Sequence, residues 1–165
     1  MLLSTPSYQQ LVKRAKQLRE AGMTVVLATG IFDLFHAEHE NYLRKAKAAG
    51  NLLIVAIESD IRARALKGEG RPIHTQEQRL NTISGLAYVD HAFILPEDFN
   101  TQEKYEQLIA ELLPNIYAVS SHSAFLDNKR MLVEKYGGTL KIVHEHNPEI
   151  STTKLAEENT HSSAA

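Results

Sequence analysis

The chain has 165 residues, with 18 Lys and Arg against 20 Asp and Glu, and it contains no Cys. This length predicts one domain, and the lack of cysteine excludes disulfides, thiolate metal sites and thiol nucleophiles. A formal net charge of −2 disfavours nucleic acid as the main ligand, because phosphate backbones are held by excess Lys and Arg. Without a leader pattern or an apolar run of about 20 residues, we expect a cytoplasmic protein that does not enter the membrane.

The hydrophobic pattern alternates between helical and strand periods along most of the chain. An amphipathic helix is predicted over residues 7–21, followed by a short, continuous apolar run over 24–28 that is typical of a strand buried on both faces. A helix over 37–49 and a second apolar run over 52–57 complete a strand–helix–strand unit. The remaining predicted elements are helices over 76–88, 102–113 and 124–136 and strands over 91–95, 116–119 and 140–143.

Five strands that alternate with helices predict a three-layer α/β fold around a five-stranded parallel sheet. Residues 1–158 are expected to form the single domain, and residues 159–165, rich in Ser and Ala, a disordered tail. In open parallel sheets, ligands bind outside the carboxyl ends of the strands, where the strand order reverses. The segment 29–39, which follows the first predicted strand, is therefore the first place to look for a site.

Two histidines, His36 and His39, lie at the start of the helix predicted over 37–49. The free N–H groups and positive dipole of a helix N-terminus favour an anion such as phosphate, and residues three apart are neighbours there. Gly30 would let a ligand approach the backbone, and Asp33 can orient the loop or a histidine. Taken alone, H-x-x-H is equally typical of structural histidines or of a metal pair, but no nearby motif supplies further zinc ligands, so we expect no metal held by the protein.

The segment Thr29–His39, TGIFDLFHAEH, is similar to the (T/N)GxFDxxHxGH signature of the cytidylyltransferase-like nucleotidyltransferases, which have a Rossmann-like fold. The similarity extends in register from about residue 7 to residue 156. It includes LKGEGRP at 66–72, Glu77–Arg79 and Ile150–Thr153. The LKGEGRP string most resembles the adenylyltransferase domain of the bacterial heptose 1-phosphate pathway, and glycerol-3-phosphate cytidylyltransferase is the next most similar.

This resemblance implies a transferase that joins a nucleoside triphosphate, ATP or CTP, to a phosphorylated sugar or polyol in sugar-nucleotide or lipopolysaccharide biosynthesis. The acceptor phosphate attacks the α-phosphorus in line and pyrophosphate leaves, with Mg²⁺ accompanying the nucleotide. Catalysis of this type consists of positioning and of neutralising charge on phosphate oxygens. Members of the family commonly dimerise, so a homodimer is also an expectation, although the sequence does not fix the oligomeric state.

The resemblance also implies roles for individual residues. The residues expected to be catalytic are His36, His39, Lys67 and Arg79. Nucleotide-binding residues are expected after the first strand, in the loop after the second strand and at the start of a further, last helix that follows residue 150: Thr29, Gly30, Ile31, Phe32, Asp33, Glu38, Arg71, Ser151, Thr152 and Thr153.

Three of these cations also have ordinary structural interpretations. Lys67 and Arg71, read singly, are typical of solvated charges in a loop. Arg79 could pair with Glu77 or Asp90. Their occurrence together, in order and at the family spacing, favours the functional interpretation.

Three positions depart from the family pattern. Glu38 replaces the HxGH glycine, so its carboxylate could clash with ATP, accept a hydrogen bond from the nucleotide, stabilise the helix N-terminus or raise a histidine pKa. After the fourth strand, residues 119–125 lack the Gly-Asp string of relatives, and Ser121 and His122 are the expected acceptor-binding residues. Residues 146–149 lack the usual basic or glycine residues. These changes support an alternative, a nucleotide-binding or regulatory protein with reduced or lost catalysis.

Overall fold

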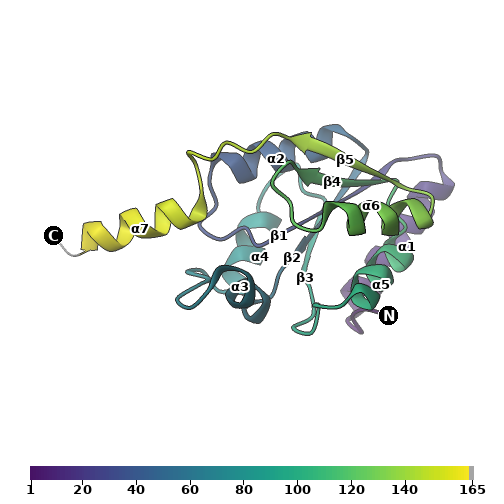
Figure 1. The fold of residues 1–165 in the computed structure, drawn as a ribbon. Coiled ribbons are helices and arrows are strands. Elements are labelled where there is room, and N and C mark those ends of the chain that lie inside the picture. The colour runs from purple at the N-terminus through teal and green to yellow at the C-terminus, as the bar shows by residue number, and fades with distance from the viewer. Residues whose placement is uncertain (164–165) are drawn as a thin grey trace.

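The computed structural model describes residues 1–163, whose apolar runs form a five-stranded parallel sheet between two layers of helices (Figure 1). The strands, in sheet order, are β3 (His91–Ile94), β2 (Leu52–Ile57), β1 (Val25–Gly30), β4 (Ile116–Ser120) and β5 (Thr139–His144). The predicted three-layer α/β fold is confirmed. Because the chain builds outward from β1 to β3 and then returns to β4, the strand order reverses between β1 and β4.

Each face of the sheet carries its own hydrophobic core. Along β1, Val25 and Leu27 face one core, whereas Val26 and Ala28 face the other. Side chains alternate along a strand, so a continuous apolar run is what a strand covered on both faces requires. The first core is covered by α1 (Pro6–Glu20), α5 (Gln102–Leu112) and α6 (Leu126–Lys135), and the second by α2 (Ala37–Ala48) and α4 (Gln76–Ser84).

One helix, α3 (Asp60–Lys67), was not predicted, because the sequence pattern placed Lys67 in a loop. At the start of α3, the Ser59 side chain accepts a hydrogen bond from the Arg62 N–H. Gly68 caps the end of the helix, and its φ of 101° favours glycine. Ala63 is its only buried residue among those described, so the segment has no apolar stripe from which a helix could be recognised.

Other boundaries differ by a few residues. Helix α4 ends at Ser84 instead of residue 88 because Gly85 caps it, and α6 begins at Leu126 instead of residue 124. The last helix, α7 (Thr152–Ser163), projects from the rest of the molecule (Figure 1). Residues 164–165, part of the tail predicted over 159–165, lie outside the described residues, and the disorder of that tail stays a prediction. Among residues 1–163, no helix combines the length and the apolar character that crossing a membrane requires.

Candidate active site

The turn after β1 brings the start of α2 to the carboxyl end of the sheet. Phe32 lies in the left-handed region with φ 56° and is buried. A Cβ at Gly30 would lie 2.7 Å from the Phe32 ring, so glycine lets this ring fold back over the strand end. The Phe32 ring then meets the His39 imidazole edge-on, with 5.6 Å between the centroids. Gly30 and Phe32 therefore shape the turn that delivers the histidines.

His36 and His39 form a reciprocal cap at the start of α2. The Glu38 N–H donates to His36 Nδ1 at 3.2 Å, and the His36 N–H donates to His39 Nδ1 at 3.3 Å. The two imidazoles stack with 3.8 Å between their centroids. Both Nδ1 atoms act as acceptors, so in the neutral rings the proton is on Nε2. The cap therefore leaves two Nε2–H donors on one side of the helix start.

Both histidines are held in the neutral form. The pKa of His39 is lowered to about 3, mainly by burial and also by the nearby His36 and Lys67, against the opposing effects of Asp33 and Glu38. Burial also lowers the pKa of His36, and this outweighs the raising effect of Glu38. The expectation that Glu38 acts to raise a histidine pKa is confirmed, although the net shift of the pKa of both histidines is downward. At neutral pH the pair acts through N–H donors, beside the positive end of the α2 dipole.

The two imidazoles line a cavity of about 350 Å³, called here the histidine cavity. It brings together predicted residues from several distant parts of the chain: His36, Glu38, His39, Lys67, His122, Ser151, Thr152 and Thr153. The remaining lining residues are Tyr42, Ser120, His144 and His146.

Lys67 and the start of α7 also line the histidine cavity. Lys67 is the exposed last residue of α3. Thr152 Oγ1 lies 3.4 Å from His36 Nε2, and the Ser151 side chain accepts from the Lys154 N–H, which caps α7. Hydroxyls and the free N–H groups of a helix start therefore face the same space as the imidazoles.

Asp33 and Arg71 form an ion pair that holds the turn together. The Arg71 guanidinium donates to Asp33 Oδ2 through Nε at 3.1 Å and Nη2 at 3.0 Å, and the N–H groups of Ile73 and His74 also donate to this carboxylate. Burial acts to raise the pKa of Asp33, but these hydrogen bonds and the Arg71 charge lower it overall. Asp33 is only 1% exposed, and its carboxylate is fully used by these bonds, so the pair positions the loops around the site. Together with His39, Asp33 and Arg71 also border a smaller hollow.

Arg79 is placed differently from the catalytic role predicted for it. Its side chain is fully buried, and it donates to the carbonyl oxygens of Ile31, Glu58 and His74 and to the Asp60 carboxylate. Four hydrogen bonds occupy four of the five N–H groups of a guanidinium. In this arrangement Arg79 ties together the ends of β1 and β2 and does not face the histidine cavity.

The Glu38 carboxylate lines the histidine cavity and is also held by hydrogen bonds within the protein. Its Oε2 accepts from His144 Nε2 at 2.7 Å and from the Asn147 N–H at 2.9 Å. Its other oxygen, Oε1, has no hydrogen-bond partner among the described residues. As the second residue of α2, Glu38 also places an acid in the first turn, as one of the sequence alternatives proposed.

The residues predicted to bind the acceptor, Ser121 and His122, lie beside the histidine cavity. The His146 N–H donates to Ser121 Oγ at 2.9 Å, and the His122 and His146 rings stack with 4.5 Å between centroids. They join the end of β4 to the segment that follows β5.

Thr29 and Ile31 hold the end of β1 within the protein. Thr29 Oγ1 lies 3.0 Å from the hydroxyl of Tyr117, whose ring packs on the face of the sheet that α1, α5 and α6 cover. The Ile31 carbonyl accepts a hydrogen bond from Arg79. The predicted nucleotide contacts of this backbone stay a prediction.

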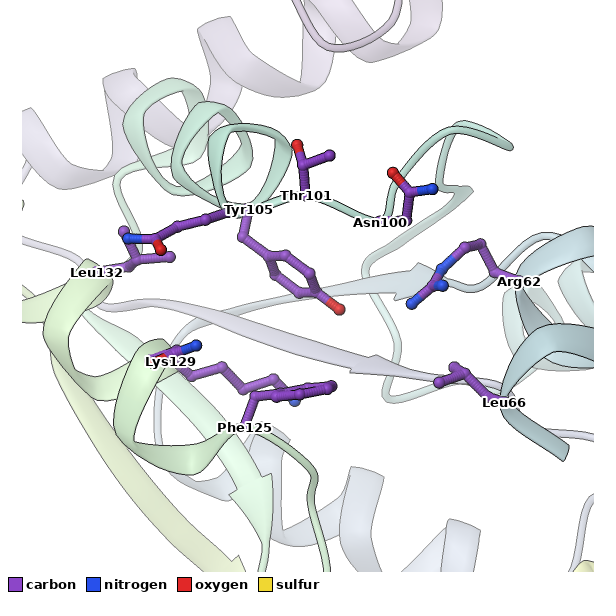
Figure 2. Close-up of a pocket in the computed structure, with 10 residues that line it drawn as sticks. Arg62, Leu66, Asn100, Thr101, Tyr105, Phe125, Lys129 and Leu132 are labelled. Atoms are coloured by element: carbon purple, nitrogen blue, oxygen red, sulfur yellow. The ribbon is translucent and has the colours of Figure 1, made fainter.

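A second pocket, of about 260 Å³, lies between α3, α5 and α6 and was missed from the sequence (Figure 2). Tyr105 points its hydroxyl into this α3–α5–α6 pocket towards Arg62, and Phe125 and Lys129 form the facing wall (Figure 2). Leu66 lines this pocket and the next residue, Lys67, lines the histidine cavity, so the end of α3 separates the two.

Lys129 is the buried cation of this pocket. It is 8% exposed, and its Nζ donates to Ser123 Oγ at 2.8 Å. Burial lowers the pKa of Lys129 to about 8, although the Glu58 carboxylate acts in the opposite direction. Glu58 Oε2 and Arg62 Nε are buried and lie 3.9 Å apart, and neither has a hydrogen-bond partner among the described residues. The sequence feature that could have indicated this pocket is the position of Lys129, three residues before Leu132 and therefore on the buried face of α6.

This strand order, with paired imidazoles at the helix start beyond the first strand, defines a Rossmann-like protein of the nucleotidyltransferase type. A model of the family described as cytidylyltransferase-like matches residues 27–163. The chain belongs to the cytidylyltransferase-like family, and the predicted family resemblance is confirmed.

Similar proteins include bifunctional protein HldE of Wolinella succinogenes, 44% identical over 115 residues, which cover 70% of this chain and 23% of that protein. HldE of Shewanella piezotolerans is 37% identical over 151 residues, which cover 90% and 30% of the two chains. The chain thus spans less than a third of these relatives.

Two solved structures are also similar. The lipopolysaccharide core biosynthesis protein of Thermoplasma volcanium is 31% identical, with a TM-score of 0.62 over 76% of this chain and 98% of the other. The pantoate–beta-alanine ligase of Francisella tularensis is 13% identical, with a TM-score of 0.53 over 90% of this chain and 75% of the other. At this identity the ligase shows the fold alone.

Proposed function

We propose that this protein is a nucleotidyltransferase that transfers a nucleotidyl group from ATP or CTP to a phosphorylated sugar or polyol and releases pyrophosphate. The observation that carries the proposal is the pair of Nε2–H donors of His36 and His39, oriented by the reciprocal cap into one cavity with Lys67 and the start of α7. The HldE relatives and the Thermoplasma volcanium lipopolysaccharide protein support a sugar phosphate as acceptor.

In the proposed reaction, an oxygen of the acceptor phosphate forms a bond to the α-phosphorus, and the bond from that phosphorus to the bridging oxygen of the β-phosphate breaks. His36 and His39 donate to the phosphate oxygens, on which charge grows, and Lys67 adds a mobile positive charge. Donors that are already oriented stabilise such charge without reorganising, which is where most of the rate enhancement would arise.

Mg²⁺ is expected to enter with the nucleotide. Across residues 1–163, no group of three or more His, Asp or Glu side chains is placed to hold a metal ion. Mg²⁺ is commonly bound by one or two carboxylates together with substrate phosphates. The histidine cavity, of about 350 Å³, fits this limited role, because phosphates held by His36 and His39 would be the main ligands of the ion. When bound, Mg²⁺ would neutralise phosphate charge.

The α3–α5–α6 pocket is the proposed place for the sugar or polyol of the acceptor. It lies at the carboxyl ends of the strands, where open parallel sheets bind ligands. Phe125 and Tyr105 offer aromatic surface to a sugar ring, and Lys129 and Arg62 supply positive charge for an anionic acceptor (Figure 2). We therefore place acceptor recognition mainly here, with Ser121 and His122 nearer the nucleotide.

Replacing Lys129 with Met is expected to raise KM for the sugar phosphate about tenfold or more, because a charge-assisted hydrogen bond is lost while the side-chain stem still packs. Steady-state kinetics with the acceptor varied at saturating nucleotide would measure this change. The nucleotide affinity should stay within about twofold of the wild type.

Lys135→Met is the matched control for this prediction, because Lys135 is exposed on the same helix and pairs with Glu106. An unchanged acceptor KM in a folded Lys129→Met protein would remove acceptor binding from this pocket.

The alternative, a binding protein with reduced catalysis, rested on Glu38, whose carboxylate could clash with ATP, and on the missing Gly-Asp string after the fourth strand. Because His144 and Asn147 hold Oε2, the Glu38 carboxylate is fixed at the cavity wall, which weakens the first of these reasons. The test is pyrophosphate release from ATP, CTP, GTP or UTP with Mg²⁺ and a panel of sugar and polyol phosphates. Release that depends on one acceptor supports the transferase, whereas nucleotide binding without release from any pair favours the alternative.

A further inference from the structure

The two oxygens of the Glu38 carboxylate have different surroundings. Oε2 is held by His144 Nε2 and by the Asn147 N–H, both within 2.9 Å. Oε1 has no partner among the described residues, and the side chain lines the histidine cavity. One oxygen is therefore tied to the protein while the other is available to a ligand.

A line of hydrogen bonds keeps this carboxylate rigid. His144 Nδ1 lies 3.2 Å from Lys45 Nζ, and an ammonium can only donate, so Nδ1 accepts and Nε2 carries the proton that faces Glu38. Burial acts to raise the pKa of Glu38, but the bonds from Asn147 and His144 lower it overall. The carboxylate is thus ionised, oriented and ready to accept.

The histidine cavity consequently has two ends of different chemistry. Successive residues of a helix are turned by about 100°, so the Glu38 side chain leaves α2 in a different direction from that of His39, and it contacts His144 and Asn147 instead of the imidazole pair. The histidine end offers donors and suits phosphate, whereas a fixed carboxylate repels phosphate and accepts hydrogen bonds. The ligand group expected beside Oε1 is therefore one that carries an O–H or N–H donor instead of a phosphate oxygen.

From this arrangement we propose that Glu38 is a specificity-determining residue: Oε1 accepts a hydrogen bond from the nucleoside half of the substrate, a ribose hydroxyl or a base amino group. The inference rests on the proposed function, because it requires the nucleotide phosphates to occupy the histidine end. It assigns a positive role to the residue that departs from the family motif.

The test is calorimetric binding, without acceptor, of whichever nucleoside triphosphate binds best. We compare its affinity with the affinities of three analogues: the 2′-deoxy form, the 3′-deoxy form and the form whose base lacks the amino group. The comparison is made for the wild type, Glu38→Gly and Glu38→Gln. We expect the wild type to bind at least one analogue about tenfold more weakly, the usual effect of losing a hydrogen bond to a charged group. The analogue that loses affinity identifies whether the sugar or the base is recognised.

Both variants should lose this discrimination, to within about twofold. Glu38→Gly removes the hydrogen-bond acceptor. Glu38→Gln keeps an oxygen for His144 and Asn147 but turns an amide donor towards the cavity. The test of the inference therefore needs only one of the two variants to fold. Glu40→Gln, at an exposed partner of Arg44 on the same helix, should retain wild-type discrimination.

Equal wild-type affinities for all the analogues, or unchanged discrimination in a folded variant, would overturn the inference alone. An effect of the variants that is seen with Mg²⁺ and vanishes in EDTA would also overturn it, because Glu38 would then act on the metal. Failure of the wild type to bind any nucleoside triphosphate would refute the proposed function and the inference together.

Discussion

Replacing His39 with Asn is expected to lower kcat for pyrophosphate release about 10²–10³-fold, the usual effect of removing one donor aimed at developing charge. The Asn side-chain oxygen can take the place of Nδ1 and accept the His36 N–H, so the cap at the start of α2 is kept. The Nε2–H donor is lost. Because burial holds the pKa of His39 at about 3, no positive charge is removed at neutral pH.

A matched variant separates the donor from the packing of the ring. Gln at position 39 reaches with its amide nitrogen to where Nε2 lies, so His39→Gln should recover at least about tenfold of the lost kcat. His91→Asn, at an exposed position on β3, should keep wild-type kcat. Equal activity of His39→Asn and the wild type would remove His39 from the catalytic set.

The fold could be predicted because its signals are local. The runs that became β1 and β2 are apolar throughout, and a strand covered by helices on both faces requires this pattern. Helix α3 could not be predicted in the same way. It lies at the carboxyl edge of the sheet, where Ile61 and Leu66 stay exposed, so burial leaves no period in its sequence.

The candidate site could be predicted only where its residues are close in the sequence. His36, His39 and Ser151–Thr153 were found from motifs, and the structure places them around one cavity. The bond from His144 to Glu38 joins residues 106 positions apart, and no local pattern indicates such a pairing. Among the alternatives that the sequence leaves open for Glu38, this bond favours an oriented hydrogen-bond acceptor over an obstacle to the nucleotide.

Arg79 shows that a motif can identify a residue without indicating what it contacts. Replacing Arg79 with Met is expected to lower the free energy of unfolding by about 3–5 kcal/mol, as found when one member of a buried charged network is removed. The carbonyls of Ile31 and Glu58 would lose their donor inside the protein, and Asp60 would lose its partner. Urea denaturation would measure the change, and Tm should fall about 2–4 °C for each kcal/mol.

The stability of this variant decides between the two roles of Arg79. Arg79→Lys should also be destabilised, because one ammonium cannot reach three carbonyl groups and a carboxylate. Arg64→Met, at an exposed position on α3, should change the free energy of unfolding by no more than about 0.5 kcal/mol. Arg79→Met could instead have the same urea midpoint of unfolding as the wild type and a lower kcat. In that case the guanidinium must leave its carbonyl partners during the reaction and contact phosphate. A stability loss without that selective effect means that Arg79 serves the reaction by holding together the strand ends that present the histidines.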